Sequence, residues 1–469
     1  MAGLPDRRRL VPSGAARPTT RIVHLGLGAF FRAHVASYLQ DLGGWGVIAV
    51  SLRSPDVREK LKPQDCVYTA AELAEGTIKT RLIEVVRDVL VAPKDQQAVI
   101  DAMCDPTISL VSLTVTEKGY CHDPATGELN WDNPDIVHDL THDLPRSAPG
   151  FIVHALQSRR AAGVPPFTVL SCDNLSDNGA LIRRVTLAFA EQVDPALANW
   201  ISETCAFPAT MVDRIVPATT DVDVATVTGL IGSHDAAPVM HEPFRQWVIA
   251  DCFHNETFPP LDQVGVQFVS DVAPFEDMKL RMLNGTHSAL AYLGYLVGHR
   301  TVAEAVTDPL FADFVRHLWT HEIGPTVAAP EGTDLSAYAE TLMSRFANRG
   351  VAHSLGQIAM DGSQKLPQRF LAPIKERLRE NQRCDGLILC VAAWMVYVSG
   401  QAGKIDVRDP LAERLSLASA DPEKSVDNIL ALREIFEPAL AEKLKVPLNQ
   451  YYADLQQHGV RDCIRKVLS

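Results

Sequence analysis

The chain has 469 residues, 46% of them hydrophobic and 22% charged, which is the composition of an ordinary globular protein with room for two or three domains. Its 57 acidic residues outnumber 44 Lys and Arg, and the resulting charge of −13 argues against nucleic-acid binding and against attraction to anionic membranes. The longest apolar run, residues 387–398, is too short for a bilayer and predicts a buried helix. Nine Cys without a C-x-x-C pair, and no apolar leader, predict a cytoplasmic protein with reduced thiols. No obligate protein partner is evident from the sequence.

The first elements along the chain predict a βαβ unit. Residues 1–20 are basic and non-periodic, so we expect a loose arm. Residues 21–25 predict a buried strand, residues 29–42 a helix after two glycines, and residues 45–50 a second strand. A strand, a glycine turn, a helix and a strand in this order favour a parallel sheet.

The remaining elements divide the chain near residue 270. Up to there we predict further strands at 108–115 and 167–171, strands within 78–90, and helices at 150–162 and 177–193. From residue 275 long helical patterns dominate, with short polar loops such as residues 330–333 and 361–363. The predicted fold class is α/β, with a Rossmann-like doubly wound domain over residues 21–270 and a mostly α-helical C-terminal domain over residues 271–469.

Gly26 and Gly28 at the first strand-to-helix turn indicate dinucleotide binding. Gly26 permits the tight turn, and Gly28 lets the backbone approach a pyrophosphate at the helix N-terminus. Phe31 stands where a third glycine is usual. The second strand has no carboxylate at its tip, so Asp56 is the candidate for the adenosine ribose. Alternatively, Arg53 stacks on the adenine or accepts a 2′-phosphate; we favour NAD over NADP.

A polar face on one predicted helix is the candidate catalytic element. At 100° per residue, Glu276, Lys279, Asn284 and His287 share one side of a sequence otherwise full of Met, Leu, Ala and Tyr. Polar groups on a buried helix need partners, which a substrate would supply. An amine base, a carboxamide and an imidazole suit the oxidation of an alcohol. The alternative is an ion pair between Glu276 and Lys279 with a structural role.

A second polar group follows a predicted strand of the first domain. Cys172, Asp173 and Asn174 come just after the strand at 167–171. Ligands of open α/β sheets bind at that edge, although an Asp-Asn pair is also common in turns.

Taken together, these segments resemble the polyol-specific long-chain dehydrogenase family, which includes mannitol 2-dehydrogenases and fructuronate reductases. The matching segments run in order through most of the chain: residues 26–34, 114–119, 171–175 with Asn178 and Gly179, 210–215, 242–248, 275–287 and 361–367.

The resemblance implies a role for individual residues. Lys279 is similar to the family's general base, Asn174 and Asn284 to the carboxamides that stabilise the substrate oxygen, and His287 to the residue that orients the substrate hydroxyl. The acids Asp213 and Glu276 are similar to residues that line the site or pass protons. The cofactor turn comprises Gly26, Gly28, Ala29 and Phe30. No metal is implied, so Lys279 acts as a base without a Lewis acid, and we expect its pKa to be lowered.

Two further segments are most similar to the fructuronate reductase branch, namely residues 116–121 and 330–335. The expected reaction interconverts D-mannonate and D-fructuronate with NAD, and the expected partner is a small sugar acid or polyol. Lys365 and Arg369, expected in a loop, could bind the substrate carboxylate or be solvated charges. The alternatives are a mannitol 2-dehydrogenase, a β-hydroxyacid dehydrogenase, whose Lys–Asn spacing is usually four rather than five, and a nucleotide sensor with a dead site.

Overall fold

A computed structural model describes residues 9–253, 258–400 and 407–469 of the chain. It divides into two compact units, Met1–Ala273 and Pro274–Ser469. Residues 1–8 of the predicted arm lie outside the described residues. From Arg9 on the arm is not loose, because Ser13 donates to the Glu84 carboxylate through its amide and its hydroxyl at 2.8 and 2.7 Å. Arg17 also donates to the carbonyl of Asp65 at 3.0 Å.

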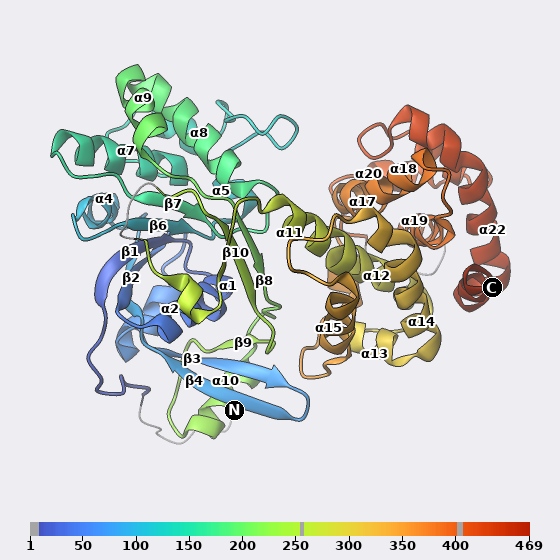
Figure 1. Cartoon of the computed structure of the whole chain (residues 1–469), viewed down its shortest axis with the longest axis horizontal. Coiled ribbons are helices and arrows are strands. Elements are labelled where there is room, and N and C mark those ends of the chain that lie inside the picture. The colour runs from blue at the N-terminus through green and yellow to red at the C-terminus, as the bar shows by residue number, and fades with distance from the viewer. Residues whose placement is uncertain (1–8, 254–257, 401–406) are drawn as a thin grey trace. The chain divides into compact units, whose positions relative to one another are not determined.

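A five-stranded parallel sheet forms the centre of the N-terminal unit, as the apolar runs predict (Figure 1). Its strand order is β5-β2-β1-β6-β7. The strands are β1 (Thr19–Leu25), β2 (Trp45–Ser51), β5 (Val86–Val91), β6 (Leu110–Leu113) and β7 (Thr168–Ser171). The chain leaves β1 in one direction to reach β2 and in the other to reach β6, and such a reversal opens a crevice at the carboxyl ends of the strands.

Helices cover both faces of this sheet, which confirms the doubly wound fold class. One apolar core joins the sheet to α4 (Gln96–Cys104), α7 (Ala148–Ala161), α8 (Asn178–Val193) and α9 (Pro195–Thr204), which lie together on one side in Figure 1. A second core joins the other face to α1 (Ala29–Ala33) and α2 (Val35–Leu42). The helix predicted over 29–42 is thus interrupted at His34, where φ is −107° and ψ is −77°.

The same unit holds two small sheets, of which only β4 (Thr77–Ile83) overlaps a predicted segment, residues 78–90. In one, β3 (Tyr68–Ala74) pairs with β4 and with β9 (Val239–His241). In the other, β10 (Gln246–Ala250) pairs with β8 (Thr210–Asp213) and with β11 (Gln267–Val269). Shorter or peripheral helices complete the unit: α3 (Asp56–Leu61), α5 (Thr116–Gly119), α6 (Pro134–Asp139) and α10 (Asp221–Ile231).

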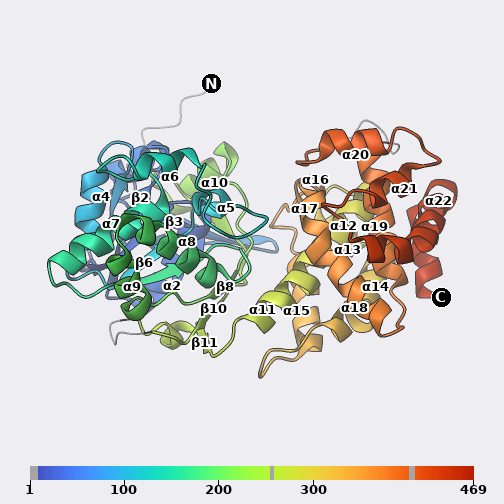
Figure 2. The ribbon, with the colours of Figure 1, turned by 90° about the horizontal axis from the view of Figure 1, so that it is seen from above.

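The C-terminal unit is helical, as predicted. Its centre is α19 (Asp385–Val398), buried over nearly its whole length, which lies against α12 (Thr286–Leu296) (Figure 2). The other helices are α11 (Ala273–Met278), α13 (Val302–Thr307), α14 (Pro309–His317), α15 (Leu335–Ala347), α16 (Leu355–Ile358), α17 (Gly362–Leu366), α18 (Ala372–Arg379), α20 (Ala412–Ala418), α21 (Ser425–Leu430) and α22 (Pro438–Leu468). Over the described ranges, none of the helices has the length and apolar character that crossing a membrane requires.

Three π-helical segments interrupt the helices of this unit, at Lys279–Gly285, Leu318–Ile323 and Pro367–Leu371. A π turn frees backbone carbonyls from the regular α-helical ladder, and side chains of the other segments bind two of them. Trp319 donates its indole N–H to the carbonyl of Met282 at 3.1 Å and to Thr286 Oγ1 at 2.7 Å. Arg369 donates to the carbonyl of Asn284 at 3.1 Å. The three segments therefore support one another.

Candidate functional site

A cavity of about 400 Å³ opens at the carboxyl ends of β1, β2 and β6 in the N-terminal unit. The glycine turn Gly26–Gly28 lines one side of it, and residues 51–53 and 114–116 line others. Lys118, Gly119, Cys121, Asp135 and residues 146–148 complete the wall. The cavity thus lies at the crevice where open α/β sheets bind their ligands.

The two glycines of the turn differ in what their backbone requires. Gly26 has a φ of +101°, and a Cβ there would lie 2.0 Å from the carbonyl oxygen of Thr114, so only glycine fits. A Cβ on Gly28 would meet nothing within 4 Å. Because Gly28 lines the cavity and carries no side chain, a bound pyrophosphate could approach its backbone closely. The turn therefore fits a dinucleotide.

The imidazole of His24 fixes this turn from inside the sheet. Its Nε2 lies 3.0 Å from the carbonyl oxygen of Gly26 and 2.9 Å from Thr114 Oγ1, and its Nδ1 lies 2.8 Å from Ser112 Oγ. Complete burial lowers the pKa of His24 to about 3, so the ring is neutral. A neutral ring places no charge beneath the phosphate-binding backbone.

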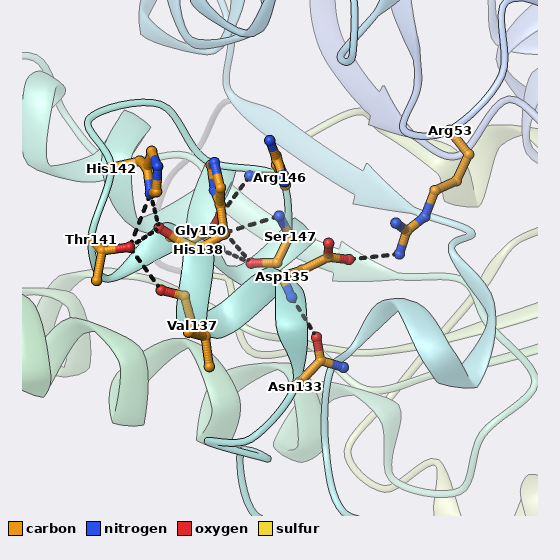
Figure 3. Close-up of polar contacts among 11 residues, drawn as sticks. Arg53, Asn133, Asp135, Val137, His138, Thr141, His142, Arg146, Ser147 and Gly150 are labelled. Carbon is orange, nitrogen blue, oxygen red and sulfur yellow. Dashed lines mark hydrogen bonds and ion pairs between the residues drawn. The ribbon is translucent and has the colours of Figure 1, made fainter.

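One rim of the cavity carries an ion pair that the sequence did not reveal. The guanidinium of Arg53 reaches the carboxylate of Asp135 at 2.8 Å (Figure 3). Both residues line the cavity, whereas Asp56, the predicted ribose acid, is exposed at the start of α3 and is not among the lining residues. Arg53 and Asp135 are far apart in sequence, so no local motif could have indicated the pair.

The far wall of the cavity is held by Asp173. Its carboxylate accepts from the amides of Val115 at 2.9 Å and Thr116 at 3.0 Å, and from the hydroxyl of Tyr120 at 2.8 Å. Burial raises the pKa of Asp173. The Asp-Asn pair after β7 is thus part of the cavity framework through its aspartate, while Asn174 beside it is exposed.

The predicted polar face of the C-terminal unit lies on a continuous helical rod formed by α11, the π segment and α12. Lys279 begins the π segment and is 8% exposed, Asn284 is half-buried within it, and His287 on α12 is 5% exposed. The assumption of 100° per residue is wrong over residues 279–285, because a π turn joins residues five apart. Lys279 and Asn284 have that spacing, so the π turn brings them onto one side.

His287 faces a second imidazole that sequence reasoning missed. The rings of His287 and His353 meet edge to face with their centroids 4.8 Å apart. The centroid of the Phe346 ring lies 4.6 Å from that of His287. Nε2 of His287 and Nδ1 of His353 are buried, and neither has a hydrogen-bond partner within the described ranges. Burial lowers the pKa of His287 well below its usual value and that of His353 to about 4. Two neutral rings therefore present unsatisfied nitrogens.

Two cations beside these rings contact no carboxylate within the part of the chain that the structure describes. Arg369 donates to Ser288 Oγ at 2.9 Å as well as to Asn284, and Lys365 donates to the carbonyls of Ile358 at 3.2 Å and Met360 at 2.5 Å. Burial lowers the pKa of Arg369 to about 10 and also lowers that of Lys365, although Asp361 and Asp409 act on Lys365 in the opposite direction. The expectation of a loop is wrong here, because Lys365 lies on α17 and Arg369 on the following π segment.

Other predicted residues occupy separate positions in their own units. Asp213 ends β8 and is buried, and Glu276 is half-buried on α11. Ala29 and Phe30 begin α1, and neither is among the residues that line the nucleotide cavity. Phe30 stacks on His34 instead, with ring centroids 4.9 Å apart.

Comparisons with known proteins agree with these two units. The family model described as the mannitol dehydrogenase Rossmann domain matches residues 20–263, and that of the mannitol dehydrogenase C-terminal domain matches residues 271–456. The chain is 44% identical to D-mannonate oxidoreductase of Escherichia coli over 96% of both chains. It is 36% identical to mannitol 2-dehydrogenase of Pyricularia oryzae over 96% of this chain and 93% of that one.

A solved structure extends the likeness to the fold. The ternary complex of Pseudomonas fluorescens mannitol 2-dehydrogenase with NAD and D-mannitol matches 98% of this chain and 97% of its own, with a TM-score of 0.86 and 38% identity. This level of identity and coverage excludes the β-hydroxyacid dehydrogenase alternative and confirms the predicted resemblance. The chain therefore belongs to the mannitol dehydrogenase family of oxidoreductases.

Proposed function

We propose that the chain is an NAD-dependent oxidoreductase that interconverts a secondary alcohol of a linear sugar acid with its ketone, with D-mannonate and D-fructuronate as the substrate pair. One observation carries the choice of a sugar acid: Arg369 and Lys365 are partly buried cations that donate to neutral oxygens and form no direct ion pair within the described ranges. Buried charge is costly when it is unpaired, and a substrate carboxylate would compensate it with charge-assisted hydrogen bonds. The 44% identity to a D-mannonate oxidoreductase supports the same choice.

The proposed chemistry assigns the proton to Lys279. As a neutral amine it accepts the proton of the substrate hydroxyl during oxidation, and as an ammonium it returns a proton to the carbonyl during reduction. The amides of Asn284 and Asn174 hold the substrate oxygen as charge develops on it. His287 offers an unpartnered Nε2 to a substrate hydroxyl, and Asp213 and Glu276 line the site or pass protons to solvent.

The proposed cofactor is NAD rather than NADP. When bound, the nicotinamide dinucleotide accepts or supplies the hydride. Gly26 and Gly28 shape the turn that would hold its pyrophosphate. Asp135 is a carboxylate within the same cavity and can accept from ribose hydroxyls, while its ion pair with Arg53 occupies the guanidinium that a 2′-phosphate would need.

Replacement of Lys279 tests the assignment most directly. Lys279→Ala should reduce kcat for fructuronate reduction by about 100-fold or more, the usual scale of general acid–base catalysis, while the affinity for NADH stays as in the parent protein. Lys375→Gln, which changes an exposed lysine of α18, is the matched control. Unchanged turnover of Lys279→Ala would remove this lysine from the mechanism. The proposal needs no Lewis acid, so dialysis against EDTA should leave turnover intact.

The alternative substrate pair is D-mannitol and D-fructose. It is favoured by the likeness to mannitol 2-dehydrogenases, including the structure solved with D-mannitol. Values of kcat/KM for fructuronate, tagaturonate and fructose with NADH separate the two. The sugar-acid proposal requires fructuronate to exceed fructose, and the reverse order would replace it with the polyol reaction.

A further inference from the structure

A second cavity of about 400 Å³ lies in the N-terminal unit and shares no lining residue with the nucleotide cavity. Its walls come from α2, from the β3–β4 hairpin, from the residue after β8 and from the segment that joins β9 to β10. Cations dominate the lining, with Lys79, Arg81, Arg214 and Arg245 facing two carboxylates, Asp41 and Glu72. The oxidoreductase reaction proposed above uses none of these residues.

The carboxylates of the cavity do not balance its cations. Asp41 is shared by two guanidiniums, accepting from Arg81 at 2.5 Å and from Arg245 at 2.7 Å. Glu72 forms an ion pair with Lys79, at 3.6 Å on the exposed side of the hairpin, and its charge also acts on Arg214. Arg245 is further held over the ring of Tyr38, with its guanidinium carbon 4.0 Å from the ring centroid. One positive charge of the Asp41 cluster is therefore left over.

Arg214 adds a buried guanidinium whose charge is offset only in part. It is buried, and it donates only to neutral carbonyls, those of Glu242 at 3.1 Å and Ala33 at 2.6 Å. Over the described residues it makes no ion pair. Burial and the neighbouring Arg245 lower the pKa of Arg214 to about 10, although Glu242, Tyr38 and Glu72 act in the opposite direction. The two carbonyls fix the guanidinium in place, so its remaining N–H groups are pre-organised toward the cavity.

We propose that this cavity binds a small polyhydroxylated organic anion through a phosphomonoester or carboxylate group. Guanidinium forks match both groups, and the fixed Arg214 next to Arg245 and Arg81 supplies the excess charge that either group would neutralise. The ligand's hydroxyl groups would find hydrogen-bond partners around the anionic group, namely the hydroxyls of Ser37 and Thr80 and the carboxylates of Asp41 and Glu72. The volume falls in the range of small-molecule sites. The ligand is thus an effector bound apart from the nucleotide.

Calorimetric titration of the NADH-saturated protein tests this site, since saturation removes binding of phosphates at the nucleotide cavity. The probes are 6-phosphogluconate, ribose 5-phosphate and gluconate, which carry both groups, phosphate alone and carboxylate alone. We expect 6-phosphogluconate and at least one of the simpler probes to bind saturably. Because the proposed substrate site also accepts linear sugar acids, binding is assigned to this cavity only where Arg81→Gln weakens it. No saturable binding of any probe would overturn the proposal.

Substitutions in and outside the second cavity test whether the measured binding occurs there. Arg81→Gln changes a half-exposed side chain and should weaken binding of 6-phosphogluconate by at least fivefold, and Arg214→Lys, which keeps the charge and removes the fork, should weaken it further. Lys60→Gln, an exposed lysine of α3 outside the cavity, should bind as the parent does. Equal affinity in Arg81→Gln and the parent, or equal loss in Lys60→Gln, would refute the assignment. Because the readout is heat rather than turnover, the outcome is independent of the role proposed for Lys279.

Discussion

Arg369 donates to the backbone carbonyl of Asn284 at 3.1 Å and so ties a buried cation to the π turn that contains a candidate catalytic amide. The same guanidinium reaches Ser288 on α12 at 2.9 Å. One side chain thus fixes both the path of the helix and the position of a positive charge. Loss of the charge and loss of the helix geometry are expected to have different kinetic consequences.

Replacement of Arg369 separates these two effects. Arg369→Lys keeps a cation and loses the fork, so kcat/KM for fructuronate should fall by about 10- to 100-fold, equivalent to roughly 1.5–3 kcal/mol for a charged hydrogen bond. The value for fructose, which has no carboxylate, should fall much less. Steady-state kinetics with both ketoses measure the difference, and Arg379→Gln at the exposed end of α18 is the control. Equal losses for both sugars would mean that Arg369 serves the helix alone.

Alanine at the two glycines of the turn should have different effects, one on thermal stability and the other on NADH affinity. Gly26→Ala should lower the thermal unfolding midpoint, because alanine at φ +101° is strained and its Cβ would meet the carbonyl oxygen of Thr114. Gly28→Ala should leave the midpoint within about 1 °C, since its Cβ enters open space. It should nevertheless weaken NADH binding about tenfold or more, because the methyl group takes the space proposed for the pyrophosphate. Calorimetry and NADH fluorescence titration read the two effects, and tight NADH binding by Gly28→Ala would contradict the proposed cofactor site.

The ion pair between Arg53 and Asp135 predicts how cofactor preference can be shifted. Asp135→Asn removes the proposed ribose acceptor and releases a guanidinium that is 71% exposed. The ratio of kcat/KM for NADPH to that for NADH should rise by about tenfold, a change of roughly 1.4 kcal/mol. Asp132→Asn, an exposed neighbour, should leave the ratio unchanged. A ratio that stays constant in Asp135→Asn would place the discrimination elsewhere, with Asp56 as the next residue to test.

Buried neutral histidines predict acid sensitivity of the N-terminal unit. Burial lowers the pKa of His24 and of His34 to about 3, so both rings take up protons on unfolding at pH values between about 3 and 6.5. The unfolded state then binds more protons, and each histidine lowers the free energy of unfolding by about 1.4 kcal/mol for each pH unit below 6.5. The full stability is present above pH 6.5.

Thermal midpoints measured between pH 7.5 and 5 test this sign. The midpoint should fall on acidification, and His24→Gln should flatten that fall while lowering the midpoint at pH 7.5. Ser112→Ala removes a hydrogen-bond partner of His24 without removing a titrating group, so its slope should match that of the parent. A slope in His24→Gln as steep as in the parent would rule out His24 as a source of the acid sensitivity.

The sequence predicted best the elements that depend on residues close together in the chain. The apolar runs at β1, β2, β6 and β7 predicted the parallel sheet, because buried parallel strands need continuous apolar residues. The helical run at 387–398 likewise corresponds to α19. The short strands β8 to β11 were missed, since three to five residues between loops carry too little periodicity.

The candidate site shows a different limit of prediction. Lys279, Asn284 and His287 could be selected because they stand out on one helix, but His353, Asp135 and Asp173 reach their partners through contacts between distant segments. Only Asp173 had a local signal, its position at the end of a strand. The helical wheel also failed over residues 279–285, because no composition rule distinguishes a π turn from an α turn.

The π turn between Lys279 and Gly285 lets this rod hold about one residue more than a regular α-helix without turning its functional side chains apart. Lys279 and Asn284 are five residues apart, a spacing that a regular α-helix would separate by about 140°. Deleting one residue from the interval 280–283 would shorten the spacing to four and let the rod return to α geometry, so the two side chains would stay within about 40° of each other. His287 would likewise keep its side, and the deletion is expected to cost the contacts of Trp319 and Arg369 with carbonyls of the π turn. A residue added to the same interval would instead rotate His287 by about 100° relative to Lys279, so insertion is expected to be more damaging than deletion.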